Sequence, residues 1–395
     1  MSADLNLTCP CCGTEGVKPF HETRAVPVNS VLMLATKQEA LDFPTGDIVL
    51  GFCASCGFVY NAAFDPGLLE YSERYDPTQA FSATFNAWHR ELAEQVVERF
   101  GLQDKRVIEI GCGKGEFLHL LAEIGGVKGV GFDPAYDAER DENAGRDGVE
   151  FVVDRYSEKY ANVQGDLVCC KMTLEHISDS SDFVGTVRRA VGDEASTQIF
   201  FQVPDVLRIL EETAFWDIYY EHCSYFSMGS LGRLFRGCGF DVVDLAREYD
   251  NQYLMIDARP AGATPTAPLS QEGDLEQLGA LVSRFAENFA SMKASWQERV
   301  ADYTRDGSRV VIWGSGSKGV SFLTTLGLED AIEYVVDINP HRQGFYMAKT
   351  GQKIVAPEFL KEYQPGVVIV MNPVYRDEIA AQLAELGLTP EVITA

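Results

Sequence analysis

Two pairs of cysteines constrain the fold of the first 70 residues more tightly than any other feature of the chain. Each pair has the spacing CxxC, and 40 residues separate one pair from the other. A CxxC turn points both sulfur atoms the same way, so two such turns together form a closed tetrahedral site with four thiolate ligands. We therefore expect a structural zinc ion bound by Cys9, Cys12, Cys53 and Cys56, with Cys11 as a competing ligand.

The chain of 395 residues is too long for one ordinary core. The stretch 259–271 is rich in Ala, Pro, Thr and Ser, which is typical of a linker. A fresh pattern of strand, glycine-rich turn and helix begins after it. We predict three domains: a zinc-binding domain at residues 1–70, a central domain at 71–262 and a C-terminal domain at 273–395.

The central part alternates strand-like and helical patterns in the way that builds a parallel sheet covered by helices. This alternation predicts an α/β fold. Two extended runs joined by a polar turn end this part, and they predict a hairpin at the edge of the sheet. The predicted elements are an opening helix at 84–100, strands at 106–110, 129–132, 149–153, 166–171 and 197–203, and hairpin strands at 240–245 and 252–257.

The C-terminal part predicts a second, smaller α/β domain. It begins with a long helical run over 275–304, and a strand, a glycine turn and a helix follow over 309–326. Further strands are expected at 332–337 and 366–371.

Charge and hydropathy exclude several classes of protein. The formal net charge of −26 would repel a nucleic acid, which usually binds a basic face. No apolar run reaches the roughly 18–20 residues that a membrane-spanning helix needs. The first seven residues lack the basic and apolar regions of a secretory signal. We expect a cytoplasmic protein, a monomer or weak homo-oligomer, that acts on a small molecule and binds neither nucleic acid nor membrane.

The sequence Val107-Ile-Glu-Ile-Gly-Cys-Gly-Lys-Gly115 is a strand that runs into a glycine-rich turn. Such glycines let backbone amides approach a ligand at the carboxyl end of a parallel strand. Glu109 precedes the turn, and Asp133 ends the next strand, where a carboxylate can accept both ribose hydroxyls. These features favour S-adenosylmethionine over a dinucleotide, and the segment resembles motif I of class I methyltransferases. The expected cofactor-binding residues are Glu109, Gly111, Cys112, Gly113, Asp133, Pro134, Met172 and, toward the adenine amino group, Asp154.

A run of acidic, basic and hydroxyl side chains over 217–227 follows the fifth predicted strand. It contains Tyr219, Glu221 and His222. His176 follows the fourth strand, so two of only six histidines should meet at the same edge of the sheet. A histidine can accept a proton at neutral pH, and a tyrosine hydroxyl can donate to an oxygen that gains charge. We therefore expect the catalytic site here.

Nearly the whole chain resembles the sugar C-methyltransferases of deoxysugar biosynthesis, which act on sugars carried by a nucleoside diphosphate. The resemblance includes the cysteine-rich part, the glycine-rich motif, the Tyr219-x-Glu221-His222 run, Trp313-Gly-Ser-Gly-Ser-Lys-Gly319 and Val336-Asp-Ile-Asn-Pro-His-Arg-Gln-Gly344. It implies a class I methyltransferase Rossmann-like domain between an N-terminal zinc-binding domain and a C-terminal Rossmann-like α/β domain.

The resemblance also implies a reaction. A base removes the proton next to a 4-keto group, and the enolate carbon then attacks the methyl group of S-adenosylmethionine. On this basis His222 is the base, Tyr219 and Glu221 orient it or steady the enolate, and His176 contacts the substrate. Tyr75 is similar to a family tyrosine near the methyl donor, although the residues that follow it diverge. The expected substrate-binding residues are Tyr225, Lys318, Asn339 and His341.

Alternatives stay open at this point. The turn over 314–319 could bind a second nucleotide, could only close over the substrate, or could hold a diphosphate with Lys318 and its backbone amides. The acceptor atom could be oxygen or nitrogen, since a hydroxyl also needs a base. A third hypothesis is a zinc-ribbon binding module that senses S-adenosylmethionine without turnover.

Overall fold

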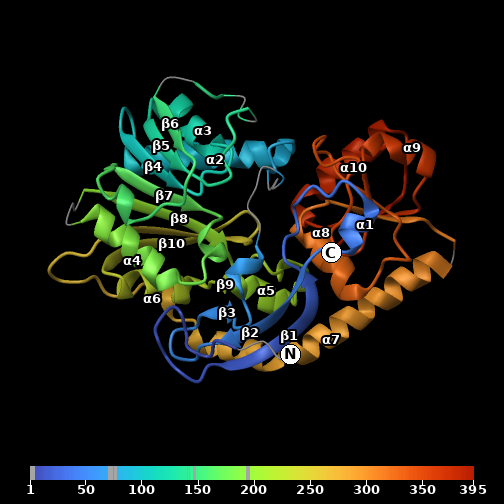
Figure 1. Cartoon of the computed structure of the whole chain (residues 1–395), viewed down its shortest axis with the longest axis horizontal. Helices are drawn as coiled ribbons and strands as arrows, with labels where there is room; N and C mark the ends of the chain where they lie inside the picture. Colours follow the sequence, from blue (N-terminus) through green and yellow to red (C-terminus); the bar gives the residue numbers. More distant parts are fainter. Residues whose placement is uncertain are drawn as a thin grey trace.

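The chain is organised around three β-sheets that lie side by side (Figure 1). A computed structural model describes residues 5–69, 74, 78–139, 141, 143–145, 148–192, 196–305 and 307–395. Over these residues it forms an antiparallel sheet of four strands, a mixed sheet of seven and a parallel sheet of five. The α/β fold expected from the sequence is therefore confirmed.

The seven-stranded sheet has the order β10-β11-β8-β7-β4-β5-β6. Strands β4 to β8 are parallel, and the antiparallel hairpin β10–β11 closes one edge, as predicted. Its strands are β4 (Arg106–Ile110), β5 (Lys128–Phe132), β6 (Val149–Val152), β7 (Leu167–Lys171), β8 (Gln198–Pro204), β10 (Phe240–Glu248) and β11 (Tyr253–Pro260), and its helices are α2 (Ala83–Phe100), α3 (Glu116–Gly125), α4 (Ser180–Val191), α5 (Val206–Glu212) and α6 (Met228–Gly237).

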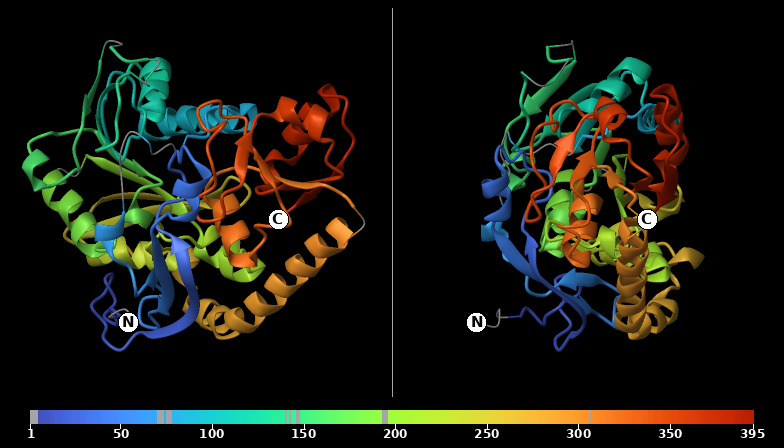
Figure 2. Two further views of the ribbon diagram at one scale, coloured as in Figure 1. Left: turned by 45° about the vertical axis from the view of Figure 1, so that its right-hand side comes forward. Right: turned by 90° about the vertical axis from the view of Figure 1, so that its right-hand side faces the viewer.

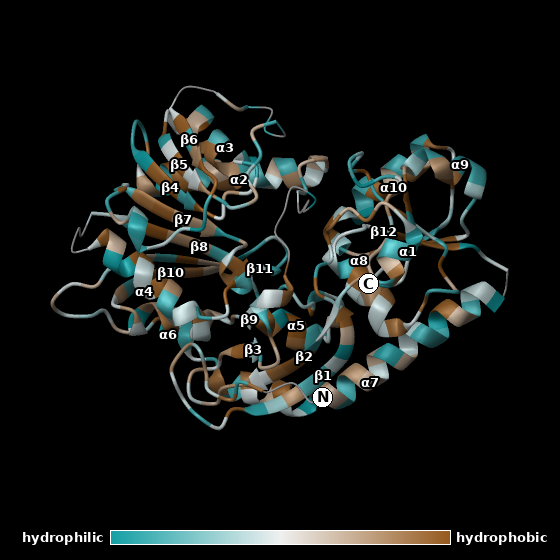
Figure 3. Cartoon of the chain, in the orientation of Figure 1, coloured by the Kyte–Doolittle hydropathy of each residue, from teal (hydrophilic) through white to brown (hydrophobic). Residues whose placement is uncertain are grey.

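The central strands are apolar because both faces of the sheet are covered (Figure 3). Neighbouring residues of one strand point to opposite faces. In β8, Phe200 therefore packs into the core that α2 and α3 cover, whereas Phe201 packs against Phe235 of α6 on the other side. The order of the strands reverses beside β4. Ligands of such sheets bind in the crevice outside the carboxyl ends of the strands at this point.

The four-stranded sheet has the order β1-β2-β3-β9 and is antiparallel. Strand β1 (Lys18–Pro27) is long and bulged, and it does not stand out in the sequence as a strand. Strand β9 (Ser224–Tyr225) belongs to the run that follows the parallel strands of the central sheet, so the four-stranded sheet contains residues far apart in the chain. The other elements here are β2 (Thr45–Phe52), β3 (Val59–Asn61) and the short helix α1 (Lys37–Leu41).

The five-stranded sheet has the order β14-β13-β12-β15-β16, and all its strands are parallel. The strand predicted at the start of 309–326 corresponds to β12, and the strands predicted at 332–337 and 366–371 correspond to β13 and β15. The elements are β12 (Val310–Trp313), α8 (Ser317–Leu326), β13 (Tyr334–Val336), β14 (Lys353–Val355), α9 (Leu360–Tyr363), β15 (Val367–Val370), α10 (Arg376–Glu385) and β16 (Glu391–Thr394).

Helix α7 (Leu275–Arg305) connects the three sheets. It starts near α5 and β1 and runs to the C-terminal sheet, as two views show (Figure 2). A second connection joins the N-terminal part to the C-terminal sheet, where Lys349 N–H donates to the Ala40 carbonyl at 2.8 Å. None of the helices in the described ranges is long and apolar enough to cross a membrane.

Arg233 of α6 fixes the place where the second cysteine-rich turn, the linker and the start of α7 meet. Its Nε donates to the Cys56 carbonyl at 2.9 Å, Nη1 to the Glu272 carbonyl at 2.6 Å and Nη2 to the Asp274 carboxylate at 2.7 Å. Asp274 also accepts a hydrogen bond from the backbone of Gly229. One planar guanidinium thus satisfies acceptors from three segments.

We predict that Arg233→Met destabilises the fold by about 2–3 kcal/mol, because it removes the charged partner of the buried Asp274 carboxylate and the donor to two carbonyls. Denaturant unfolding of the full chain measures this loss. The matched control is Arg305→Met, since Arg305 pairs with Asp302 at the surface, where their side chains are 72% and 56% exposed. Equal unfolding midpoints for the two variants would contradict the role of Arg233.

Candidate active site

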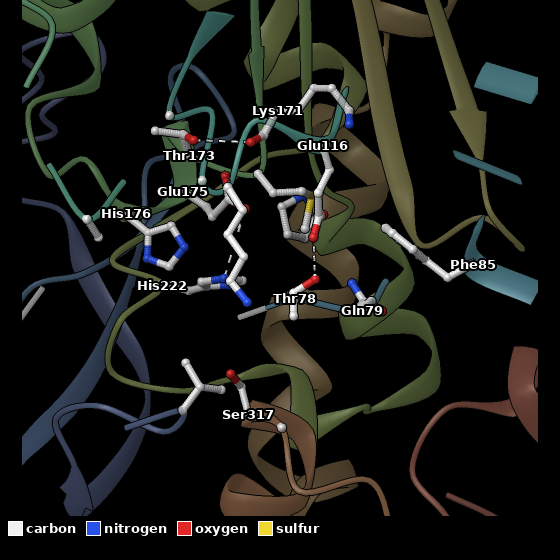
Figure 4. A pocket seen from close by; sticks show the side chains of 18 of the residues that line it. Thr78, Gln79, Phe85, Glu116, Lys171, Thr173, Glu175, His176, His222 and Ser317 are labelled. Carbon is white, nitrogen blue, oxygen red and sulfur yellow. Dashed lines mark hydrogen bonds and ion pairs between the residues drawn. The ribbon is translucent and has the colours of Figure 1, made fainter. Parts of the chain in front are cut away.

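One cavity of about 800 Å³ opens at the carboxyl edge of the seven-stranded sheet. This volume suits a small-molecule site. Its wall includes the glycine-rich turn after β4, the residues that follow β5 and β7, and the turn between β12 and α8. Val31 and Phe64 of the N-terminal part also line it. Figure 4 shows Glu175, His176 and His222 together on one side, with Ser317 across from them.

The turn after β4 can only be built with glycine at its first position. Gly111 has φ 71°, and a Cβ there would lie 1.9 Å from the Thr173 hydroxyl oxygen. The Gly111 amide donates to the Phe132 carbonyl at 2.8 Å, which fixes the turn against β5. Cys112 is buried under this turn and lines the cavity. The backbone is thereby exposed to a ligand at the end of the strand.

Asp133, directly after β5, holds the same turn from the other side. Its carboxylate accepts from Gly113 N–H at 2.9 Å and from Ala135 N–H at 2.8 Å, and burial raises its pKa. Pro134 and Met172 line the cavity beside it, and Met172 has the positive φ of 50°. Asp154 also lines the cavity, but its carboxylate accepts hydrogen bonds from Lys159 and Tyr160. Tyr75 lies outside the described residues.

Glu109 and Lys171 place two titratable groups at the carboxyl ends of β4 and β7. Burial raises the pKa of Glu109 to about 8, and one of its oxygens accepts no hydrogen bond from the described residues. Lys171 Nζ lies 2.7 Å from His89 Nε2 and 3.8 Å from the centre of the Phe117 ring. Both Glu109 and Lys171 line the cavity, so they can contact the charged end of a cofactor.

Tyr219 and His222 form the hydrogen-bonded pair of the predicted catalytic run. The Tyr219 hydroxyl lies 2.9 Å from His222 Nε2, and both side chains line the cavity. Burial, followed by the charges of His176 and Lys318, lowers the pKa of His222 well below its usual value. His176 meets His222 edge to face, with ring centres 4.8 Å apart. The sequence expectation that the two histidines meet is confirmed.

Glu221 points away from this pair. Its side chain is 1% exposed, and its carboxylate accepts from Ser30 N–H at 2.9 Å and from the Ser30 hydroxyl. The Ser30 oxygen in turn lies 2.7 Å from the Ser317 hydroxyl of α8. Glu221 therefore holds the N-terminal part and the C-terminal turn against the catalytic run, and Glu221 is not among the residues that line the cavity.

Tyr225 and His341 also lie apart from the cavity wall that the structure describes. Tyr225 is buried in the core, where its hydroxyl donates to the Tyr219 carbonyl at 3.4 Å and so supports the catalytic run. His341 is exposed, with its ring 5.9 Å from that of Phe81, a lining residue.

Glu175 is the acidic residue of the site that sequence reasoning missed. It precedes His176 in the short turn Leu174–His176 after β7 and lines the cavity. Its Oε1 lies 4.0 Å from His222 Nε2. The sequence did offer one indication, because Glu175 adjoins His176, which was already placed at the sheet edge. Only its contact with His222, 47 residues later, distinguishes Glu175 from an ordinary turn residue.

The turn between β12 and α8 repeats the arrangement of the first glycine turn. The Asp337 carboxylate accepts from Ser315 N–H at 2.9 Å and from Asn339 N–H at 2.8 Å. Lys318 donates to Asp217, and Asn339 lies buried with its amide nitrogen unpaired within the described ranges. No described side chain caps the first turn of α8, so its backbone amides can bind an anion. Lys318 and Asn339 both line the cavity.

The four predicted metal ligands converge in the N-terminal part. Sγ of Cys9 lies 3.6 Å from Sγ of Cys56, and the same distance joins Cys12 and Cys53. All four sulfurs lie within 4.8 Å of one another. Tetrahedral zinc–sulfur bonds of about 2.3 Å would place sulfurs about 3.8 Å apart, so the four thiols fit such an ion. Cys11 is not part of this group of four.

Comparison with known proteins agrees with this arrangement. Residues 85–245 match the methyltransferase domain family, and residues 269–389 match the family of C-methyltransferase C-terminal domains. The C-methyltransferase NovU of Streptomyces niveus is 28% identical over 350 residues, which cover 84% of this chain and 81% of NovU.

Solved structures are similar over part of the chain. The 1,6-didemethyltoxoflavin-N1-methyltransferase of Burkholderia thailandensis is 15% identical, with 45% of this chain and 82% of that chain covered at a TM-score of 0.34. The PH0226 protein of Pyrococcus horikoshii OT3 is 17% identical, with 47% and 94% covered at a TM-score of 0.38. The two family matches together with NovU identify an S-adenosylmethionine-dependent methyltransferase domain that is followed by a C-methyltransferase C-terminal domain.

Proposed function

We propose that this C-methyltransferase acts on a nucleotide-linked 4-keto deoxysugar, at a carbon next to the ketone. One observation carries the proposal: a single cavity joins the glycine turn for the methyl donor, the Tyr219–His222 pair and the uncapped start of α8. An acceptor that reaches all three must have a reactive carbon at one end and an anionic group at the other.

The anionic group would lie at the C-terminal turn. The backbone amides at the start of α8 point their partial positive charge into the cavity. Lys318 and Asn339 add hydrogen-bond donors there. The diphosphate of a nucleoside diphosphate is negatively charged, and its oxygen atoms can accept hydrogen bonds from these donors. Asp337 occupies the position of a ribose-binding acid, but unlike Asp133 it also accepts from the Ser315 hydroxyl and lies 3.7 Å from the Arg342 guanidinium, which favours a site for the substrate over one for a second dinucleotide.

The reacting end would lie between His222 and the first glycine turn. S-adenosylmethionine supplies an electrophilic methyl group when it is bound there. His222 Nε2 accepts the proton from the carbon next to the carbonyl. Once Nε2 carries that proton, the Tyr219 hydroxyl no longer donates to it and can donate instead to the oxygen on which negative charge develops.

The test is an assay with full-length protein, S-adenosylmethionine and a nucleotide-linked 4-keto-6-deoxysugar in deuterated water, read by NMR and mass spectrometry. We expect exchange of the proton next to the ketone together with the gain of one methyl group. His222→Ala should lower both rates by about 100-fold or more while the affinity for the cofactor is kept. Tight cofactor binding with neither exchange nor methyl gain on any such sugar would contradict the proposal.

Asp133 should hold the ribose of the cofactor. We predict that Asp133→Ala weakens binding of S-adenosylhomocysteine by about 10- to 100-fold, because a charge-assisted pair of hydrogen bonds and the support of the Gly113 amide are both lost. Calorimetry measures the dissociation constant. Asp337→Ala is the matched control, since it removes the equivalent acid of the other turn and should leave this constant unchanged. Equal losses in both variants would show that the two turns share one ligand.

We also propose that the four converged cysteines bind structural zinc, which closes the N-terminal part against α6. Cys53→Ser should lower the zinc content of the purified protein from one ion per chain and lower its melting temperature, because three ligands hold the ion less well than four. Metal analysis by mass spectrometry measures the content. Cys238→Ser, at a half-buried thiol outside the cluster, is the control. Unchanged zinc in Cys53→Ser would refute the assignment.

A further inference from the structure

Glu175 brings a buried carboxyl group into the cavity without a partner from the protein. Its residue is 1% exposed, and neither carboxylate oxygen accepts a hydrogen bond within the described ranges. Burying such a group costs free energy, and unpaired buried groups of this kind persist mainly at functional sites.

The geometry places this carboxyl beside the base. Oε1 lies 4.0 Å from His222 Nε2, the same nitrogen that meets the Tyr219 hydroxyl. The neighbouring acid in the sequence, Glu221, is held by Ser30. Within the part of the chain that the structure describes, Glu175 is therefore the carboxyl that faces the imidazole, and Figure 4 shows the two side chains converging.

We propose that ionised Glu175 is the positioning residue that stabilises the protonated form of His222 during the reaction. This inference rests on the proposed function, because it assigns the proton that the reaction releases. The C–H bond next to the ketone breaks, its electron pair enters the enolate, and the proton goes to Nε2. The imidazolium then donates to the Glu175 carboxylate, and the proton finally leaves to water after methyl transfer.

The surroundings explain why His222 needs this partner. Burial and the positive charge of Lys318 oppose a second positive charge on the imidazole. A base so weakened would not remove a proton from carbon unless a negative charge stood nearby. The titratable groups around the pair are His176 on the turn of Glu175, Cys170 of β7, Tyr219 and Tyr225 of the catalytic run, Tyr253 of β11, Asp217, and Lys318 of α8.

A metal ion is the competing occupant, since Glu175, His176 and His222 offer atoms within 4.8 Å of one another. Ligands of one zinc ion lie about 3.3 Å apart, whereas Oε1 and Nε2 are 4.0 Å apart, and Nε2 already meets the Tyr219 hydroxyl. The distances therefore favour an ion pair between Glu175 and protonated His222 over a shared metal ion.

The first test needs no substrate. Six histidines make ring NMR of ¹³C-histidine-labelled full-length protein tractable, with His176→Gln and His222→Gln used for assignment. Burial raises the pKa of Glu175 to about 8. We therefore expect the His222 signal to shift with a midpoint near pH 8 in the native protein, and this step to vanish in Glu175→Gln. Glu123→Gln, at a half-exposed carboxyl of α3 that pairs with Arg90 away from the cavity, is the control and should keep the step.

Thermal melting checks that Glu175→Gln is folded, and its pH dependence is a second test of the raised pKa of Glu175. A carboxyl whose pKa is raised in the folded state contributes stability at low pH that is lost as the pH rises from about 4.5 toward 8. Glutamine does not ionise, so the Glu175→Gln variant does not lose this stability as the pH rises. The variant should therefore melt higher than the native protein at pH 8.5, and the difference should shrink toward pH 4.5.

The activity test uses the ketosugar assay. Glu175→Gln should lower kcat for proton exchange and for methyl transfer together by about 100-fold, with KM little changed, and Glu175→Asp should recover part of the loss. A His222 titration that is the same in Glu175→Gln and the native protein would overturn the inference. So would a second zinc ion per chain that this variant removes. If the native protein processes no such sugar, the proposed function fails, and the NMR titration still decides the pairing.

Discussion

The site depends on one chain of buried hydrogen bonds that runs from Glu221 through Ser30 to Ser317. Glu221 belongs to the catalytic run, Ser30 to the N-terminal part and Ser317 to the first turn of α8. Leaving the buried Glu221 carboxylate without its donors would cost free energy, so this link helps to hold the three segments together. The cavity forms where they meet.

Much of this could be predicted from the sequence, because regular elements leave local patterns. The alternating runs from Arg106 onward place five parallel strands within a residue or two of their observed ends. The glycines of the turn at Gly111 predict that the backbone lies close to another group there. In the structure that group is the Thr173 side chain. The spacing of the four cysteines is enough to bring their sulfurs together. In each case neighbours in the sequence supply the constraint.

The rest depends on contacts between distant residues, which leave no local pattern. Strand β9 has two residues and is a strand only because Val59 pairs with Tyr225. Glu221 stands next to His222 in the sequence, yet its carboxylate is drawn to Ser30, 191 residues away. The sequence suggests that Glu221 lies beside the His222 imidazole, but in the structure Glu175 lies there. Adjacent residues in an irregular run point in different directions, so adjacency is a poor guide there.

The pairing of β3 with β9 also determines the order in which the sheets can be completed during synthesis. The first three strands of the N-terminal sheet are complete by Asn61, but their fourth neighbour, Ser224–Tyr225, follows the whole parallel core of the central sheet. During synthesis on the ribosome, the edge of β3 therefore stays without its partner strand until that core has been made. Strands β1 to β3 are thus made before the parallel core of the central sheet, and the catalytic run, made after that core, completes their sheet.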